Sequence, residues 1–359
     1  MPNKLKYIKN LKGGRFITSF CGSAYTSEGF VNFCENSYSA NNFRYILKGH
    51  SPDLKSQLFY ALDARLSDAG YEHTVIKNCF GTPASILCGG KKLEIIDGTY
   101  PFSAEPVSYG SFDKIIDISS FQNIDGLKKE SEKIRDLLLC LKKQEHRTIR
   151  FLAAAAGVRN DCRRIDAERT DRRKLNRFSS KLWSKYGERP NGSVGMQKKV
   201  FDDISEHNIG IFDACERVVI INDDFGFAAQ SVTEKIRAYA LSSGFDVLSF
   251  MSICDPYGTP EHIIVPGIGL GIFTKSCSQK ICPVGKKIHA ERFYQREKAG
   301  LEKNRLAFGK KAFKGLVDEA YKSIKEIENI NAELDKIYLP HTQINALIAS
   351  VLRTVLGSD

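Results

Sequence analysis

One pattern of fifteen residues occurs twice in this chain, and it constrains the fold more than any other feature. Residues 81–95 (GTPASILCGGKKLEI) align without a gap on residues 258–272 (GTPEHIIVPGIGLGI), which lie 177 positions later, and seven of the fifteen positions are identical. Repetition at such a separation indicates a tandem duplication of one structural unit. Each half of the chain can therefore be interpreted by comparison with the other half.

Both halves show the same order of predicted elements. In the first half an apolar run at residues 45–47 enters a loop, a helical pattern follows, and a strand is predicted at residues 73–76. In the second half the apolar run is at residues 218–221, the helix at about 231–241 and the strand at 245–253. Strand, loop, helix and strand in this order predict parallel βαβ units, and hence the α/β class.

Long helical patterns follow each α/β part. A chain of 359 residues can bury two cores. We therefore expect a first domain over residues 1–190, with a helical hairpin appended at about 125–186. We expect a second domain over residues 196–359, with C-terminal helices at about 290–356. The Gly- and Pro-rich segment at residues 187–195 is the best candidate linker.

The loop of the first half has much of the pattern of a phosphate-binding P-loop. A P-loop reads Gly-x-x-x-x-Gly-Lys-Ser/Thr between a strand and a helix. Its backbone N–H groups hold the phosphates, its Lys reaches the β- and γ-phosphates, and its hydroxyl binds Mg²⁺. Residues 49–56 keep Gly49, Lys55 and Ser56 at this spacing, and His50 inside the loop is a further candidate contact.

Two residues of this loop oppose tight phosphate binding. Leu54 stands where a P-loop has its second glycine, and it places a side chain where the backbone must approach the phosphates. Asp53 adds a carboxylate to the same segment. If Asp53 faces the phosphates, a like-charge contact at about 4 Å costs about 4 kcal/mol at an effective dielectric constant of about 20. If it faces outward, most of that cost disappears.

A P-loop enzyme also needs an acidic residue at the end of an apolar strand, where it helps to hold Mg²⁺. Asp97 follows the mainly apolar strand predicted at residues 93–96 (LEII) and fits this role. The first half therefore supplies Lys55 for the phosphates of ATP, and Ser56 and Asp97 for a magnesium ion. The repeat register places Thr274 opposite Asp97 in the second half, and threonine cannot replace the carboxylate.

The corresponding loop of the second half has lost the charged parts of the pattern. Gln230 occupies the lysine position, and Asp223 and Asp224 make the loop acidic. Ser231 keeps the hydroxyl position, but a serine at a helix start is commonly only an N-cap. We therefore interpret Gln230 and Ser231 as vestiges of a phosphate site.

The positive charge of the chain is concentrated in one segment. The net charge is +11, and residues 142–199 contain 17 Lys and Arg against 6 Asp and Glu, so this segment carries all of it. A local positive field indicates where an anionic partner would bind, although a solvated helix face has the same composition. The candidate anion-binding residues are Arg163, Arg164, Arg172, Arg173, Lys174 and Arg177.

These segments together resemble an uncharacterised bacterial family of tandem P-loop ATPase-like proteins. Its members carry two loops of the Gly-Gly-Pro-Gly-Thr-Gly-Lys-Ser type, each followed by an Asp-Gly-Thr-like segment and helices. The similar stretches are residues 14–32, 45–49, 95–99, 150–156 and 332–340. The resemblance implies two P-loop NTPase-like folds and nominal ATP binding. The chain departs from the family pattern at both loops, so it resembles a diverged member.

Two hypotheses for the function follow. The first is an ATPase-family protein that binds ATP and Mg²⁺ at most weakly in its first half and has lost the site in its second. The alternative is a non-catalytic scaffold, a pseudo-NTPase, that binds nucleic acid or another polyanion through residues 142–199. The ten cysteines have no framework spacing, and no apolar run approaches the roughly 18 residues of a membrane span. We therefore expect a cytoplasmic protein without a membrane partner.

Overall fold

A computed structural model describes residues 19–33, 42–187, 194–201, 215–277, 284–298, 300 and 302–357. Residues 14–18 of the family-like stretches and residues 188–193 of the candidate linker lie outside these ranges. The described strands form one sheet of twelve strands and a separate two-stranded hairpin. The order in the large sheet is β14-β10-β13-β12-β11-β9-β1-β5-β6-β7-β4-β8.

Each half of the chain supplies six neighbouring strands of the large sheet. The first half supplies β1 (Ser19–Cys21), β4 (Phe43–Lys48), β5 (Thr74–Lys77), β6 (Pro83–Cys88), β7 (Leu93–Asp97) and β8 (Asp113–Asp117). The second half supplies β9 (Gln197–Phe201), β10 (Arg217–Asn222), β11 (Val247–Met251), β12 (His262–Val265), β13 (Leu270–Lys275) and β14 (Lys286–His289). The hairpin consists of β2 (Ser23–Thr26) and β3 (Gly29–Asn32).

The strand directions repeat from one half to the other. β7, β4 and β8 are parallel in the first half, and β13, β10 and β14 are parallel in the second. β6 and β12 run antiparallel to both of their neighbours. The same order and the same directions are the result expected from a duplicated unit. The antiparallel pairing of β1 with β9 at Cys21 and Phe201 joins the halves into one continuous sheet.

The α/β class is confirmed, but the sheet is mixed and not purely parallel. The difference arises where β5 meets β6. The turn between them includes Asn78 and Gly81, whose φ is +75°, and so short a connection makes a hairpin, whereas parallel strands need a long crossover. The Gly-Thr-Pro pattern that marks the duplication therefore lies at a hairpin turn in the first half.

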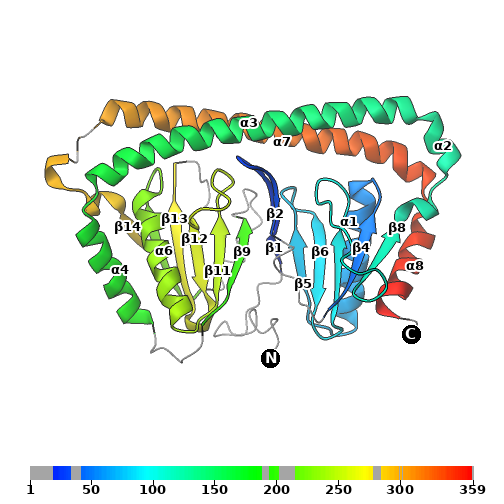
Figure 1. Ribbon diagram of the computed structural model, residues 1–359, viewed down its shortest axis with the longest axis horizontal. Helices are drawn as coiled ribbons and strands as arrows, with labels where there is room; N and C mark the ends of the chain where they lie inside the picture. Colours follow the sequence, from blue (N-terminus) through cyan, green and yellow to red (C-terminus); the bar gives the residue numbers. More distant parts are fainter. Residues whose placement is uncertain are drawn as a thin grey trace.

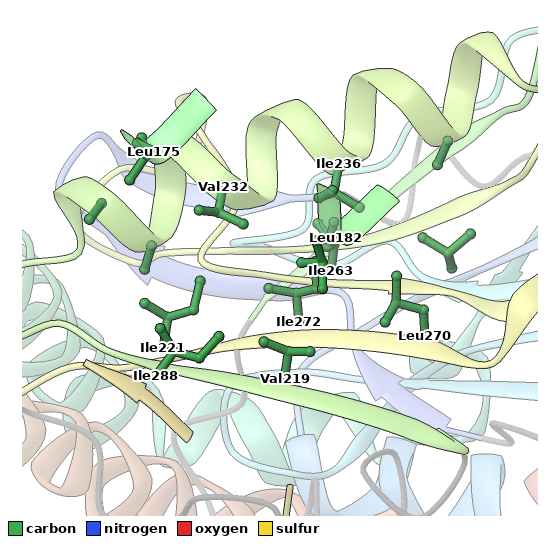
Figure 2. Close-up of a cluster of buried hydrophobic side chains, with 14 of the residues drawn as sticks. Leu175, Leu182, Val219, Ile221, Val232, Ile236, Ile263, Leu270, Ile272 and Ile288 are labelled. Carbon is green, nitrogen blue, oxygen red and sulfur yellow. The ribbon is translucent and has the colours of Figure 1, made fainter. Parts of the chain in front are cut away.

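One helix from each half packs directly on the sheet. These are α1 (Pro52–Asp68) and α6 (Phe227–Ser242). Leu54, Leu58, Leu62 and Leu66 of α1 are fully or almost fully buried, as their helical spacing predicts. Figure 2 shows the equivalent core of the second half, where side chains of α6 lie over the sheet residues Ile221, Ile263 and Ile272.

The remaining helices lie outside the sheet, the two longest along one edge of it and the shorter ones beside these or against α1 and α6 (Figure 1). They are α2 (Ile124–Lys129), α3 (Ser131–Arg169), α4 (Arg172–Tyr186), α7 (Lys303–Tyr338) and α8 (Ile344–Leu356). Short 3₁₀ segments are η3 (Ile118–Phe121), η5 (Pro266–Ile268), η6 (Ala290–Phe293), η7 (Arg296–Lys298) and η8 (Leu339–His341). No helix in the described ranges combines the length and apolar character needed to cross a bilayer.

The two long helices lie side by side across the whole molecule (Figure 1). Arg147 of α3 pairs with Glu319 of α7, and Asp161 of α3 pairs with Arg305 of α7, so the helices are antiparallel. A helix of 39 residues is about 58 Å long. Each long helix therefore carries the chain from one half of the sheet to the other.

The terminal helices are exchanged between the halves as a result. α4, which follows the first half in sequence, packs on α6 of the second half through Leu175 and Leu182. α8, which ends the second half, packs on α1 of the first half through Leu347 and Val351. The expected hairpins on their own domains are therefore replaced by a reciprocal exchange, because α3 and α7 are too long to fold back within one half.

Two glycines of α7 provide a matched test of the contact between the long helices. A Cβ at Gly309 would lie 2.3 Å from Sγ of Cys162 on α3, whereas a Cβ at Gly315 would meet no atom within 4 Å. Gly309→Ala should lower the free energy of unfolding by about 1–2 kcal/mol through overpacking. Gly315→Ala should raise it by about 0.5–1 kcal/mol, because alanine favours helix. Urea unfolding of both variants measures this, and equal shifts would contradict the contact.

Candidate functional site

The segment between β4 and α1 is shorter than the predicted phosphate loop. Only Gly49 to Ser51 separate the strand from the helix, and α1 already begins at Pro52. Ser51 is the N-cap and accepts a hydrogen bond from the N–H of Leu54. A proline is favoured at the first helical position because its missing N–H has no partner there. The segment from Pro52 to Lys55 is therefore helix, and it does not form the expected cradle.

Leu54 does not face a ligand, contrary to the sequence prediction. Its side chain is fully buried in the core between α1 and the sheet. Gly49 has a φ of +146°, and a Cβ there would lie 2.8 Å from Cβ of Ile118. Gly49 is thus required by local packing. The Asp53 side chain is exposed, and its carboxylate accepts a hydrogen bond from Nε2 of Gln57 at 2.9 Å.

A carboxylate from α7 occupies the N-terminus of α1. Oδ1 of Asp335 accepts a hydrogen bond from the Ser51 hydroxyl at 2.6 Å, and Oδ2 accepts one from the N–H of Asp53 at 3.1 Å. Free N–H groups and the helix dipole make this position favourable for an anion. Burial raises the pKa of Asp335. The protein thus supplies its own anion where a phosphate was expected.

Lys55 and Asp97 meet as the sequence analysis requires. β4 and β7 are adjacent and parallel, with Leu47 opposite Asp97, so both residues lie at the same edge of the sheet. Nζ of Lys55 lies 2.7 Å from Oδ2 of Asp97, and the two side chains are only 7% and 8% exposed. Oδ1 of Asp97 accepts the N–H of Thr99 at 2.9 Å. The ion pair therefore holds a buried lysine in the cavity wall.

Ser56 and Asp97 do not fit a magnesium site as they stand. The Ser56 hydroxyl donates to the carbonyl oxygen of Pro52 at 3.0 Å, within its own helix, and the Asp97 carboxylate is engaged by Lys55. The described ranges contain no group of three or more His, Cys, Asp or Glu side chains placed to hold a metal ion. We therefore assign no step to Mg²⁺. His50 lines the same cavity and stacks on Tyr338, and burial lowers its pKa.

A second polar centre lies in the same cavity, and sequence reasoning missed it. Glu145 of α3 is 3% exposed and accepts hydrogen bonds from the hydroxyls of Tyr25 and Tyr100, both at 2.7 Å. Burial and the hydrogen bond to Glu145 raise the pKa of Tyr100 to about 12. Burial and Glu145 raise the pKa of Tyr25 further. Both phenols therefore remain protonated donors near neutral pH.

Between these two centres lies a cavity of about 1270 Å³. It is bounded by the first turn of α1, the ends of β4 and β7, and the long helices. Its residues on α3 run from Ser131 to Glu145, which corresponds to about 21 Å of helix. Apolar walls come from α2, α3 and α7, and cations at the cavity are Lys55, Lys128, Arg135, Lys142 and Lys336.

The equivalent position in the second half is filled by protein. Asp223 is buried and accepts the N–H groups of Gly226 and Ala229, both at 3.0 Å, at the start of α6. Ser231 is not the N-cap, because Gly226 takes that place and the Ser231 hydroxyl donates to the carbonyl oxygen of Phe227. Gln230 is 1% exposed, and neither polar atom of its side chain has a hydrogen-bond partner among the described residues.

Arg159 of α3 enters the site of the second half. Its guanidinium donates to Ser252 Oγ at 2.8 Å and lies 2.5 Å from a carboxylate oxygen of Glu261. Burial alone would lower the pKa of Arg159, but Glu261 together with Cys254 and Asp255 outweighs burial and raises it. Thr170 and Thr342 each form an isolated β-bridge just after a long helix, so they are equivalent positions of the two halves. Arg159 lies eleven positions before Thr170, and Asn331 lies eleven positions before Thr342, so Asn331 is the counterpart of Arg159. Asn331 lines the open cavity of the first half.

The candidate anion-binding residues divide into two groups. On α3, Arg163 lies 3.6 Å from Asp255, and Arg164 pairs with Asp161 and Glu168. The other group lies on α4 and is exposed: Arg172, Arg173, Lys174 and Arg177. The basic segment of the sequence therefore divides in the structure into arginines of α3 that are paired with carboxylates and exposed cations of α4.

The two tyrosines at Glu145 give a second matched test. Tyr25 is 3% exposed and Tyr100 is 53% exposed, although both donate to the same carboxylate. Tyr25→Phe should lower the free energy of unfolding by about 1–3 kcal/mol, because no water replaces the lost donor. Tyr100→Phe should cost less than about 1 kcal/mol, because water can reach the carboxylate. Thermal or urea unfolding measures both, and a larger loss for Tyr100→Phe would contradict this geometry.

Comparison with known proteins does not add a relative. No protein-family model matches the chain, and no curated protein or solved structure matches it significantly. The resemblance to tandem P-loop ATPase-like proteins therefore stays a prediction from sequence. The function has to be argued from the residues of the site.

Proposed function

We propose that the cavity of the first half binds a small anionic ligand, and that a nucleotide is the leading ligand class. The observation that carries this proposal is the buried ammonium of Lys55, held by Asp97 in the wall of the cavity. It lies at the carboxyl ends of parallel strands, where open α/β sheets bind ligands. The cavity is also large enough for a nucleotide, since small-molecule pockets span about 300–1,000 Å³.

The cavity lining carries charges of both signs, so its cations would attract an anion while its carboxylates limit the affinity. Lys128, Arg135, Lys142 and Lys336 line the cavity beside Lys55 and would attract phosphate oxygens. A phosphate at the start of α1 must first displace Asp335 from Ser51 and from the Asp53 N–H. At Lys55 it must compete with Asp97. Binding is therefore an exchange of one anion for another, and we expect it to be weak.

This arrangement suits binding better than hydrolysis. The Ser56 hydroxyl donates to a carbonyl oxygen of its own helix, and the Asp97 carboxylate is paired with Lys55. Neither side chain is therefore available to orient or activate a water molecule. In the second half, Asp223, Gln230 and Arg159 fill the corresponding space. We infer a receptor with one binding half and one supporting half. The ATPase activity implied by the family resemblance forms no part of this proposal.

Removal of the Lys55 ammonium tests the proposal most directly. Lys55→Ala should weaken the binding of ATP, measured by calorimetry with and without Mg²⁺, at least about tenfold, the equivalent of about 1.4 kcal/mol. Lys48→Ala is the matched control, because Lys48 ends β4, the strand before α1, and pairs with Glu105 but does not line the cavity. Equal affinities for the two variants would contradict the role of Lys55, as would no binding of millimolar ATP by the unchanged protein.

Neutralising the internal anion should have the opposite effect. Asp335→Asn removes the charge at the start of α1 and should tighten ATP binding about tenfold, because the phosphate no longer competes with a carboxylate. Glu326→Gln makes the same charge change on α7 at an exposed side chain that does not line the cavity, and it should leave the affinity unchanged. If calorimetry shows no gain for Asp335→Asn, the phosphate does not reach α1.

A further inference from the structure

The exposed side of α4 consists of cations and small polar residues. The helix has six Lys and Arg and no acidic residue in its 15 residues. Arg173, Arg177 and Lys181 are all exposed and follow one another at intervals of four, so they form a row with about 6 Å of helix rise between neighbours. The opposite side, with Leu175 and Leu182, is buried against α6.

Cations from the second half flank this row. Lys235 of α6 donates to the Asn176 side chain on one side of α4. On the other side, the Arg292 guanidinium of η6 stacks 5.5 Å from the ring of Phe178, and Lys174 donates to the carbonyl oxygen of Tyr294. We define the α4 basic face as Arg173, Lys174, Arg177, Lys181, Lys235 and Arg292. It exists only because α4 packs on the other half of the molecule.

The central cations of this face are not neutralised by neighbours. Arg173, Arg177 and Lys181 form no ion pair with any described residue. Asp171 caps α4 through the N–H groups of Arg173 and Lys174, and its carboxylate lies 3.9 Å from Nζ of Lys174, which leaves the three residues of the row without an ion-pair partner among the described residues. The arginines of α3 differ, since Arg163 and Arg164 already have carboxylate partners. Among the six candidate anion-binding residues, the unpaired cations therefore lie on α4, whereas Arg163 and Arg164 of α3 are already paired.

The exchanged helix of the other half is an internal control for this composition. α8 packs on α1 as α4 packs on α6, and its buried Leu347 and Val351 correspond to Leu175 and Ser179 of α4. In its 13 residues α8 has one cation, Arg353, and no acidic residue. The same structural position therefore does not require a row of cations. The charge of α4 serves something other than packing.

We propose that the α4 basic face binds the phosphate backbone of double-stranded nucleic acid. Arginine suits phosphate because its planar guanidinium donates two parallel hydrogen bonds. No large aromatic or aliphatic side chain on α4 is exposed, so the face lacks the rings on which single strands stack. It also lacks an apolar surface for insertion into a membrane, because the apolar side of α4 faces α6. Because contacts to phosphate carry no information on the bases, we expect this binding to be independent of base sequence.

The proposal does not rest on the ligand of the cavity, and a direct binding assay tests it. A fluorescent 20-base-pair duplex of arbitrary sequence is titrated with the full chain, and anisotropy is read at several salt concentrations. If the protein makes three to five phosphate contacts, raising the salt from about 50 to about 200 mM should weaken binding roughly 40- to 500-fold. The triple variant Arg173→Gln, Arg177→Gln, Lys181→Gln should bind at least about tenfold more weakly and lower the slope of log K against log salt by about three.

Two further variants make the result decisive. Lys129→Gln, Lys133→Gln, Lys143→Gln removes the same charge from exposed positions on α2 and α3 over the other half, and it should change affinity less than about threefold. Arg173→Lys, Arg177→Lys keeps the charge and should retain most of the binding. The proposal is overturned if both glutamine triples weaken binding equally. It is also overturned if the duplex is not bound at 50 mM salt, or if only vesicles containing phosphatidylserine are bound.

Discussion

The antiparallel packing of α3 on α7 is the interaction on which the rest of the structure depends. Each long helix begins over one half of the sheet and ends over the other, so each delivers side chains to both halves. α3 places Glu145 in the first cavity and Arg159 in the second site, and α7 places Asp335 at the start of α1. Small residues such as Gly309 allow the close approach. The contents of both sites are therefore set by the helix pair as much as by the sheet.

Sequence reasoning succeeded where a feature is local or is fixed by strand order. The helix with Leu58 and Leu62, the α/β class and the repeat all follow from periodicity and alignment. The meeting of Lys55 with Asp97 could be anticipated, because parallel neighbouring strands end at one edge. Asp335 could not, since it lies 280 residues from Lys55 and only the exchange brings it there. Glu145 had one signal: it falls on the buried side of α3, in line with Leu141 and Leu152.

The two halves show how one fold can hold a cavity at one site and buried polar side chains at the equivalent site. The strand order and the first turn of the sheet-packed helix are shared, but four changes distinguish the sites. Asn331 stands where the other half has Arg159, and Lys55 where it has Gln230. Asp97 corresponds to Thr274, and the α1 N-terminus takes its anion from α7, whereas α6 takes its anion from Asp223. The fold tolerates both because its stability comes from the apolar cores beneath.

The reciprocal exchange of α4 and α8 also sets the order in which the chain can become stable during synthesis. Ile344 of α8 comes more than 270 residues after Asp68, the last residue of α1, yet the two helices share a core. Until α8 leaves the ribosome, the apolar side of α1 that it covers stays exposed to water. The first half of the chain is thus synthesised first, but its apolar core is completed last. Such intermediates are prone to aggregation, and contacts so distant in sequence slow folding.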